Sequence, residues 1–452
     1  MTTTDLIIIG AGPGGYRAAE YAAKAGKKVV IAESAQVGGT CLNVGCIPTK
    51  TLARNAEVID TIREASLFGL SGMEDGAALT SSLDYAKVME RKEAVLAQLR
   101  GGIETLLSSP SITLVRGEAS FVAPHTVAIG DEEYTAPHII IATGSRPRML
   151  RLESCDESMV VSSDEMLSLT SLPRRLCIIG AGVIGMEFAS IFSSFGCDVT
   201  VIEFLKECLP VLDSDIAKRL RKSLEKKGVT FVMQSAVKAV LPGAVEYERK
   251  GKTERVETDR VLMAVGRAPR LEELQLERAG ITYSPKGIEV DEHLQTHVEG
   301  VYAIGDVNGR QMLAHAATMQ GIHAVNHILG RPDQIDLSVM PSAVFTRPEA
   351  ASVGLSEDAC KEQSLNYVCR KVFHRANGKA LAMNETEGMV KMMVDAETGR
   401  ILGCHGYGAH VADMVQEVAA LMCTHTTVSQ LADITHIHPT LGEMVQDLAC
   451  ET

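Results

Sequence analysis

Two stretches of the chain repeat the same pattern of apolar and polar positions. Residues 6–33 (LIIIGAGPGGYRAAEYAAKAGKKVVIAE) align without a gap on residues 176–203 (LCIIGAGVIGMEFASIFSSFGCDVTVIE). In each copy an apolar run of strand length enters a G-x-G-x-x-G turn, a helical pattern rich in small residues follows, and a Val/Ile-rich run ends at a glutamate. Gly26 and Gly196 are predicted to stop the two helices. The pattern therefore predicts an α/β fold with two Rossmann-like domains.

The glycines and glutamates of the two copies suit dinucleotide binding. Each turn needs one glycine for the tight bend, one for the approach of a pyrophosphate and one for close packing of helix on strand. These positions are Gly10, Gly12 and Gly15 in the first copy and Gly180, Gly182 and Gly185 in the second. A carboxylate at the end of the second strand, as at Glu33 and Glu203, accepts hydrogen bonds from ribose hydroxyls and repels a 2′-phosphate, so Glu203 predicts NAD rather than NADP. One such turn could be an ordinary turn, but two copies predict two dinucleotides, most simply FAD and a nicotinamide.

Further apolar runs that end in Gly or Pro mark the predicted crossings between domains. They are IIIATGSRPR (139–148), VLMAVGRAPR (261–270) and VYAIGDV (301–307). From Pro341 onward, strand-like runs at Met389–Val394 and Ile401–Tyr407 precede a helical pattern at Val411–Cys423. This change predicts a separate C-terminal α+β domain.

Composition and charge exclude several classes of protein. The chain has 44 Lys and Arg against 57 Asp and Glu, a formal net charge of −13, which argues against a nucleic-acid partner. The absence of Trp also argues against a stacking surface for single strands. No apolar stretch approaches the roughly 18 residues of a membrane span, and the N-terminus lacks the pattern of a signal peptide. We therefore expect a cytoplasmic protein with no membrane partner.

One pair among the eleven cysteines has a spacing that suggests chemistry. Without a secretory signal, most of the cysteines are expected to be reduced and buried. Cys41 and Cys46 instead lie beside a predicted helix start, after Gly38 and Gly39. A helix N-terminus lowers the pKa of a thiol, and a disulfide here could accept two electrons. The spacing by itself favours two structural thiols over a redox pair, and no second pair supports zinc, so no metal is expected.

An ordered set of motifs resembles the flavin-dependent disulfide reductases over nearly the full length. Besides the two glycine turns, it comprises GGTCLNVGCIPTK (38–50), ATGSRP (142–147), VGRAP (265–269), VYAIGDV, LAHAA (313–317), PSAVFTRPEAASVG (341–354) and HIHPTLGE (436–443). The first of these is most similar to the branch of the family that oxidises dihydrolipoyl groups. The resemblance implies an FAD-binding domain with a redox disulfide (1–145), an NAD-binding domain (146–270), a central segment that completes the FAD site (271–339) and an interface domain (340–452).

The resemblance also implies catalytic roles for particular residues. Cys41 would exchange with the substrate and Cys46 would lie against the flavin. Lys50 would place its ammonium near the flavin, paired with Glu187. His438 and Glu443 would form the acid/base dyad, because an imidazole must move the protons of the dithiol and a carboxylate must orient it. His436 is expected to be a bystander.

Cofactors and partners follow from the same resemblance. The implied FAD contacts are Gly10, Gly12, Gly15, Glu33, Thr40, Lys50, Gly144, Asp306, Ala314 and His315. The implied NAD contacts are Gly180, Gly182, Gly185, Glu187, Glu203 and Gly266. The family implies a homodimer with composite active sites. Its expected partners are lipoyl domains and core subunits of 2-oxo-acid dehydrogenase complexes, or the lipoyl carrier of glycine cleavage.

Three alternative functions have less support in the sequence. Mercuric-ion-reducing members carry vicinal cysteines near the C-terminus, where this chain has Cys450 alone. The glutathione- and trypanothione-reducing members use NADP, which Glu203 opposes. A non-catalytic nucleotide-binding scaffold predicts the loss of a reacting residue, and none is missing. Departures from the family pattern occur at Thr49, Arg270 and Gly442, none of them a reacting group; Arg270 is expected to bear on nucleotide affinity.

Overall fold

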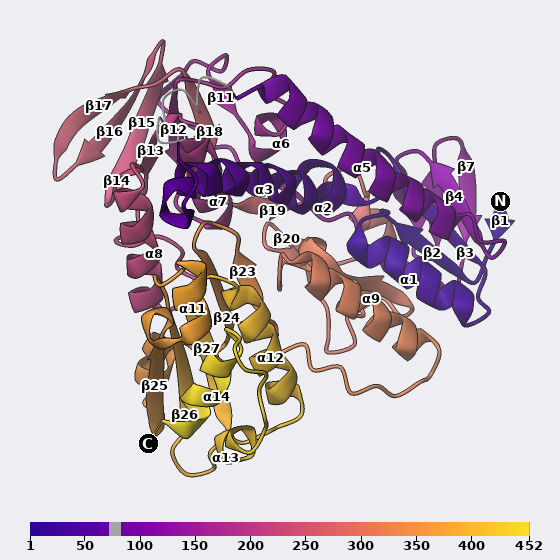
Figure 1. Ribbon diagram of the computed structural model, residues 1–452. Coiled ribbons are helices and arrows are strands. Elements are labelled where there is room, and N and C mark those ends of the chain that lie inside the picture. The colour runs from indigo at the N-terminus through magenta and orange to yellow at the C-terminus, as the bar shows by residue number, and fades with distance from the viewer. Residues whose placement is uncertain (72–82, 452) are drawn as a thin grey trace.

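The computed structural model describes residues 1–71 and 83–451. Within these ranges the chain forms three lobes, each built around a five-stranded sheet (Figure 1). The predicted α/β class, with two Rossmann-like domains and a C-terminal α+β domain, is confirmed. None of the described helices combines the length and the apolar character needed to cross a membrane.

The sheet of the first lobe is parallel and buried on both faces. In spatial order its strands are β22 (Val301–Ala303), β8 (His138–Ile141), β2 (Leu6–Ile9), β3 (Val29–Glu33) and β4 (Ile112–Arg116). Ile7 and Ile9 pack into one core, whereas Leu6 and Ile8 pack into another on the opposite face. This double burial explains why the strand is a continuous apolar run.

Helices and a small sheet cover the two faces of the first sheet. The helices on the Leu6 face are α1 (Pro13–Lys24), α5 (Tyr85–Leu107) and α9 (Ala314–Ile328). The sheet on the Ile7 face contains β1 (Thr2–Thr3), β7 (Glu132–Thr135), β6 (Thr126–Ile129) and β5 (Ala119–Ala123). The first lobe therefore has three layers.

The second lobe repeats this arrangement. Its parallel sheet contains β11 (Val160–Val161), β18 (Arg260–Met263), β12 (Arg175–Ile179), β13 (Asp198–Ile202) and β14 (Thr230–Val232). Helices α7 (Val183–Ser194) and α8 (Ser214–Lys226) pack on one face, and α6 (Ser163–Met166) lies beside β11 and β18. The other face carries β10 (Ser154–Cys155), β15 (Ser235–Leu241), β16 (Ala244–Arg249) and β17 (Lys252–Glu257). The second lobe therefore has the same three-layer arrangement as the first, in agreement with the repeat in the sequence.

The third glycine of each turn is required by close packing. A Cβ on Gly15 would lie 1.9 Å from the carbonyl oxygen of Gly10, and one on Gly185 would lie 2.0 Å from that of Gly180. Either contact would force the helix away from its strand. The two helices can therefore begin directly on the turns only with glycine at these positions.

The C-terminal lobe is an antiparallel sheet with helices. Its strands are β23 (Ser342–Val344), β24 (Glu349–Gly354), β27 (Ile401–Gly408), β26 (Met389–Asp395) and β25 (Tyr367–Phe373). Its helices are α10 (Glu357–Glu362), α11 (Gly378–Met383), α12 (Val411–Cys423), α13 (Val428–Ala432) and α14 (Glu443–Cys450). The helix expected at Val411–Cys423 has those bounds in the structure.

The other described elements are the two helices that carry Cys41 and Cys46, two short strand pairs and several 3₁₀ turns. They are α2 (Gly39–Val44), α3 (Cys46–Arg63), β9 (Ser145–Pro147), β19 (Arg267–Pro269), β20 (Tyr283–Ser284), β21 (Gly287–Ile288) and the 3₁₀ turns η1 (Ala65–Phe68), η2 (Leu276–Ala279), η3 (Gly305–Asn308) and η4 (His374–Ala376). α3 runs between the first two lobes (Figure 1) and packs against α7. The antiparallel pair β9 and β19 forms the crossing between these lobes.

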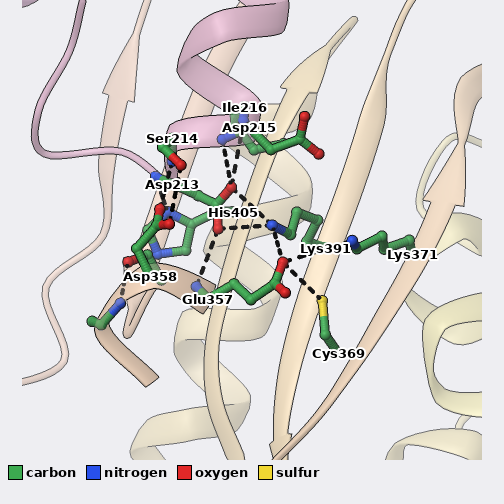
Figure 2. Close-up of polar contacts among 12 residues, drawn as sticks. Asp213, Ser214, Asp215, Ile216, Glu357, Asp358, Cys369, Lys371, Lys391 and His405 are labelled. Atoms are coloured by element: carbon green, nitrogen blue, oxygen red, sulfur yellow. Dashed lines mark hydrogen bonds and ion pairs between the residues drawn. The ribbon is translucent and has the colours of Figure 1, made fainter. Parts of the chain in front are cut away.

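A buried ionic cluster joins the second lobe to the C-terminal lobe (Figure 2). The Lys391 ammonium, 1% exposed, donates to both oxygens of Asp213 at 2.8 Å and lies 2.6 Å from Glu357. Asp213 also caps α8, and its own N–H donates to Nδ1 of His405. Burial alone would raise the pKa of Glu357, but hydrogen bonds from Lys361 and Lys391 lower it to about 2. Asp213 of the second lobe is thus bonded to Lys391 and His405 of the C-terminal lobe, across the boundary between the two.

Replacing Lys391 by Met is expected to lower the free energy of unfolding by about 3–5 kcal/mol, because the buried carboxylate of Asp213 loses its counter-ion. Glu357 keeps its ion pairs with Lys361 and Lys371. Urea unfolding followed by circular dichroism measures the loss. Lys371→Met is the matched control, since Lys371 pairs with Lys391 across β25 and β26 and lies 3.6 Å from Glu357, but is 38% exposed. The control should cost no more than about 1 kcal/mol. An equal loss of unfolding free energy in the two variants would contradict the role of Lys391 as the buried counter-ion.

Candidate active site

The two cysteines are brought together by a break between two helices. Cys41 lies in α2, and Cys46 is the first residue of α3. Gly45 separates the helices, and a Cβ there would lie 2.9 Å from the carbonyl oxygen of Thr40. The Thr49 hydroxyl donates to the carbonyl of Gly45 at 2.6 Å, which secures the start of α3. The break between the helices therefore brings the two thiol groups close enough to share a hydrogen bond.

The reduced pair holds its negative charge on Cys46. The hydrogen bond from the Cys41 thiol, aided by the Lys50 ammonium, outweighs burial and lowers the pKa of Cys46 to about 7. The same hydrogen bond, together with burial, raises the pKa of Cys41. Cys46 also stands at the N-terminus of α3, where the helix dipole favours a thiolate. Above about pH 7 the reduced pair is therefore mainly a thiol beside a thiolate.

Lys50 follows Cys46 by one helical turn and is paired across the lobes. Its ammonium lies 2.8 and 2.9 Å from the two oxygens of Glu187, a residue of α7 that is 4% exposed. Glu187 also accepts the N–H of Phe345 at 2.9 Å. The α3 helix is thereby connected to both other lobes at the point where its cysteine lies.

Glu33 and Glu203 occupy equivalent places and make equivalent bonds. Glu33 accepts the N–H groups of Ala11 and Ala35, both at 2.9 Å. Glu203 accepts those of Ala181 at 2.6 Å and Leu205 at 2.7 Å. Each carboxylate is thus fixed against its glycine turn while its oxygens keep further lone pairs for a ligand.

Asp306 is partly buried and is oriented by two residues outside the predicted set. The Ser145 hydroxyl donates to Oδ2 of Asp306 at 2.5 Å, and Nε of Arg267 donates to the Ser145 oxygen at 2.7 Å. Burial raises the pKa of Asp306. Ser145 lies in the motif ATGSRP and Arg267 in VGRAP. Their place in these motifs was the signal that could have pointed to them from the sequence.

The other predicted cofactor positions lie at turns and at one helix start. Gly144 and Gly266 have φ of 71° and 102°, and no atom lies within 4 Å of a Cβ built on either. They are linked through the crossing strands, since Arg148 N–H donates to Gly266 and Arg270 N–H donates to Gly144. Ala314 and His315 begin α9, and Nε2 of His315 lies 2.8 Å from the carbonyl oxygen of Pro341.

The predicted dyad lies apart from the cysteines of the same chain. Nδ1 of His438 lies 2.8 Å from Glu443, whose other oxygen accepts the Thr440 N–H at 2.8 Å. The Thr440 N–H and then His438 lower the pKa of Glu443. His438 is 81% exposed. Glu443 starts α14, which is well separated from α2 (Figure 1). One chain thus presents the dyad and the thiols on different surfaces.

Comparison with known proteins identifies the family. The model for pyridine nucleotide-disulphide oxidoreductases matches residues 4–321, and the model for their dimerisation domain matches residues 340–449. The chain belongs to the pyridine nucleotide-disulphide oxidoreductase family. Its cofactors are FAD and NAD.

Individual oxidoreductases resemble the chain over its full length. It is 39% identical to the dihydrolipoyl dehydrogenase of Mycoplasma pneumoniae over 98% of this chain and 97% of that protein. It is 38% identical to that of Geobacillus stearothermophilus over 99% and 95%. A Cu(II) complex of the HOCl-induced flavoprotein disulfide reductase RclA from Escherichia coli matches with a TM-score of 0.88 and 29% identity, over 100% of this chain and 99% of the other.

The residues present fit two dinucleotides. A Cβ on Gly12 would meet only the Cα of Gly39, at 3.9 Å, and one on Gly182 would meet nothing within 4 Å. No side chain caps the helix that starts at either position. The first-turn N–H groups of α1 and α7 therefore remain available to phosphate oxygens.

Glu203→Gln is expected to raise the ratio of kcat/KM for NADP⁺ to that for NAD⁺ by roughly tenfold or more, because a like charge is removed from the place of a 2′-phosphate, and tenfold corresponds to about 1.4 kcal/mol. Steady-state kinetics with both nucleotides measure the ratio. Glu33→Gln is the matched control, since Glu33 makes the same two bonds in the first lobe; it should loosen FAD and leave the ratio unchanged. An unchanged ratio in Glu203→Gln would show that Glu203 does not discriminate between NAD⁺ and NADP⁺.

Proposed function

We propose that this oxidoreductase is a dihydrolipoyl dehydrogenase, which oxidises protein-bound dihydrolipoyl groups and reduces NAD⁺ to NADH. The observation that carries the proposal is the Cys41–Cys46 pair, in which the charge rests on Cys46 beside Lys50. The names of the relatives that match over the full length support the same activity.

The first half of the reaction is thiol–disulfide exchange. A substrate thiolate attacks Sγ of Cys41, the bond between Cys41 and Cys46 breaks, and Cys46 leaves as a thiolate. Because a low pKa makes a good leaving group, Cys46 suits this step. The second substrate thiolate then attacks the first substrate sulfur, which is now bonded to Cys41. This attack closes the lipoyl disulfide and releases Cys41. The substrate has lost two electrons, which the cysteine pair has gained.

The second half returns the pair to the disulfide. FAD, when bound, supplies the path by which two electrons pass from the cysteine pair to NAD⁺. Glu33, Asp306 and the first glycine turn would hold it, and Glu203 and the second turn would hold the nucleotide. Over the whole cycle two S–H bonds become one S–S bond, and NAD⁺ becomes NADH with release of one proton.

The dyad manages the protons of the exchange. Neutral His438 takes a proton from an attacking thiol and then returns one to the departing Cys41 thiol, and Glu443 orients the ring through Nδ1 and stabilises the imidazolium. Because the dyad and the thiols lie on different surfaces of one chain, we infer that His438 serves the cysteines of a partner subunit. The proposed enzyme is therefore a homodimer with two composite sites, consistent with its dimerisation domain.

The proposed macromolecular partners carry lipoyl groups. They are the lipoyl domains and core subunits of 2-oxo-acid dehydrogenase complexes, or the lipoyl carrier of glycine cleavage. The proposed location is the cytoplasm, where these carriers would meet the enzyme.

The rival activities have less support. A mercuric-ion reductase would need vicinal cysteines near the C-terminus, and only Cys450 stands there. An NADP-dependent reductase of glutathione or trypanothione is opposed by the carboxylate of Glu203. A non-catalytic scaffold would not need a lowered pKa at Cys46 or a paired imidazole at His438.

Cys46→Ser should retain FAD and lose turnover of dihydrolipoamide with NAD⁺, because no disulfide can then accept the two electrons. The flavin spectrum and NADH formation measure the two properties. Cys155→Ser, at an exposed cysteine outside the site, is the control and should keep both. Turnover that persists in Cys46→Ser would overturn the mechanism.

His438→Gln should lower dihydrolipoamide oxidation by roughly 10²–10⁴-fold, the size of a general acid–base contribution. Oxidation of NADH by artificial electron acceptors should change far less, because no dithiol proton moves there. His436→Gln is the control: His436 is bonded to Glu417 at 2.8 Å, as His438 is to Glu443. Equal losses in the two assays would count against the acid/base role.

Mixed dimers test whether the dyad acts across subunits. Cys46→Ser and His438→Gln homodimers each lack one half of every site. A heterodimer of the two variants contains one intact composite site and should recover activity. No recovery in heterodimers that have formed would mean that each chain uses its own His438.

A further inference from the structure

The segment from Phe345 to Arg347 of the C-terminal lobe lies against the helix that carries Glu187. The N–H of Phe345 donates to Glu187 at 2.9 Å, and the N–H of Arg347 donates to Oγ of Ser190 at 3.1 Å. Glu187 and Ser190 are one turn apart on α7. The backbone around Phe345 is therefore fixed on both sides by α7.

The Arg347 side chain anchors the same segment to two further elements. Its guanidinium lies 3.2 Å from Glu64, just after α3, and 3.1 Å from Glu385 of the C-terminal lobe. It also donates to the carbonyl of Glu57 within α3. None of these contacts involves the ring of Phe345, so the segment keeps its place when the ring is changed.

The ring of Phe345 faces the Lys50 ammonium. The distance from Nζ to the ring centroid is 4.7 Å, within the range of a cation–π contact. The Lys50 side chain is 34% exposed, so water competes for the ammonium on the sides that neither Glu187 nor the ring covers. Lys50 is therefore held by one charged group and one uncharged group.

The two anchors of Lys50 have opposite effects on Cys46. The Lys50 ammonium lowers the pKa of Cys46, whereas the Glu187 carboxylate raises it. A carboxylate anchor thus cancels part of the charge that it holds in place. An aromatic face attracts a cation through its quadrupole and carries no net charge, so it can hold Lys50 without this cost.

We propose that Phe345 is a positioning residue, whose ring holds the Lys50 ammonium where its charge stabilises the Cys46 thiolate. The proposal rests on the assignment of Cys46 as the thiolate of the redox pair. Phe345 stands within the motif PSAVFTRPEAASVG, which by itself indicates no role for the ring.

The test measures the ionisation of Cys46 directly. In the Cys41→Ser holoenzyme, the rate of Cys46 alkylation by iodoacetamide is followed by mass spectrometry across pH, and its midpoint gives the pKa of that thiol. Phe345→Leu should raise the midpoint measurably, by up to about 0.4–0.7 pH units, because Lys50 loses a contact of about 0.5–1 kcal/mol that holds its charge near Cys46. Phe345→Tyr keeps the aromatic face and should leave the midpoint within about 0.2 units of the parent.

Two results would overturn the proposal: an unchanged midpoint in Phe345→Leu, or an equal rise in Phe345→Tyr. If the leucine variant does not fold, trifluorophenylalanine at position 345 keeps the shape of the ring and weakens its quadrupole. That protein should also show a raised midpoint, and the parent value would contradict the proposal.

Lys50→Met in the same background separates this inference from the proposed enzyme activity. It should raise the midpoint more than Phe345→Leu, because the whole charge is removed, and no rise would overturn the role of both residues. The midpoint does not depend on the substrate. An enzyme that fails to oxidise dihydrolipoamide, yet shows these shifts, would refute the proposed activity and leave the role of Phe345 standing.

Discussion

The ion pair between Lys50 and Glu187 connects the three lobes at the cysteines. The two residues are 137 positions apart in the chain, and Glu187 is a further 158 positions from Phe345, whose N–H it accepts. A carboxylate that is 4% exposed is costly unless it is paired and hydrogen-bonded. The pair can satisfy Glu187 only if α7 stays against α3 and the C-terminal lobe stays against α7. The burial of one charge thus constrains the docking of all three lobes.

The same constraint sets the chemistry of the thiols. The break at Gly45 places Cys41 in one helix and Cys46 at the start of the next, so the two thiols share a hydrogen bond but have different surroundings. Cys46 has the helix N-terminus and Lys50 beside it, and its pKa is lowered to about 7. Cys41 donates the hydrogen bond and its pKa is raised. Because the two thiols have opposite pKa shifts, Cys46 suits the role of leaving thiolate and Cys41 that of the exchanging thiol.

Charge pairing also organises the parts of the chain that lie away from the thiols. Lys391 and Asp213 bury their charges between the second lobe and the C-terminal lobe, with the partly buried Glu357 beside them. The C-terminal lobe also carries His438 and Glu443. Because each buried charge has its partner on another element, the lobes can dock in few other ways. The position of the dyad relative to the first two lobes is therefore set by interactions inside one chain.

The local pattern of the sequence determined the elements, and the docking of lobes determined the contacts between them. Gly10, Gly180 and the apolar runs beside them predicted both Rossmann-like domains, because turns and buried strands depend on neighbouring residues. The helix at Val411–Cys423 was predicted to the residue for the same reason. By contrast, Lys391 interrupts an apolar strand and would be expected at a surface, yet it is 1% exposed. Its place, the Ser145 and Arg267 contacts to Asp306, and the ring of Phe345 beside Lys50 depend on residues far away in the chain. Such partners meet only after the lobes have packed, so only the tertiary structure decided them.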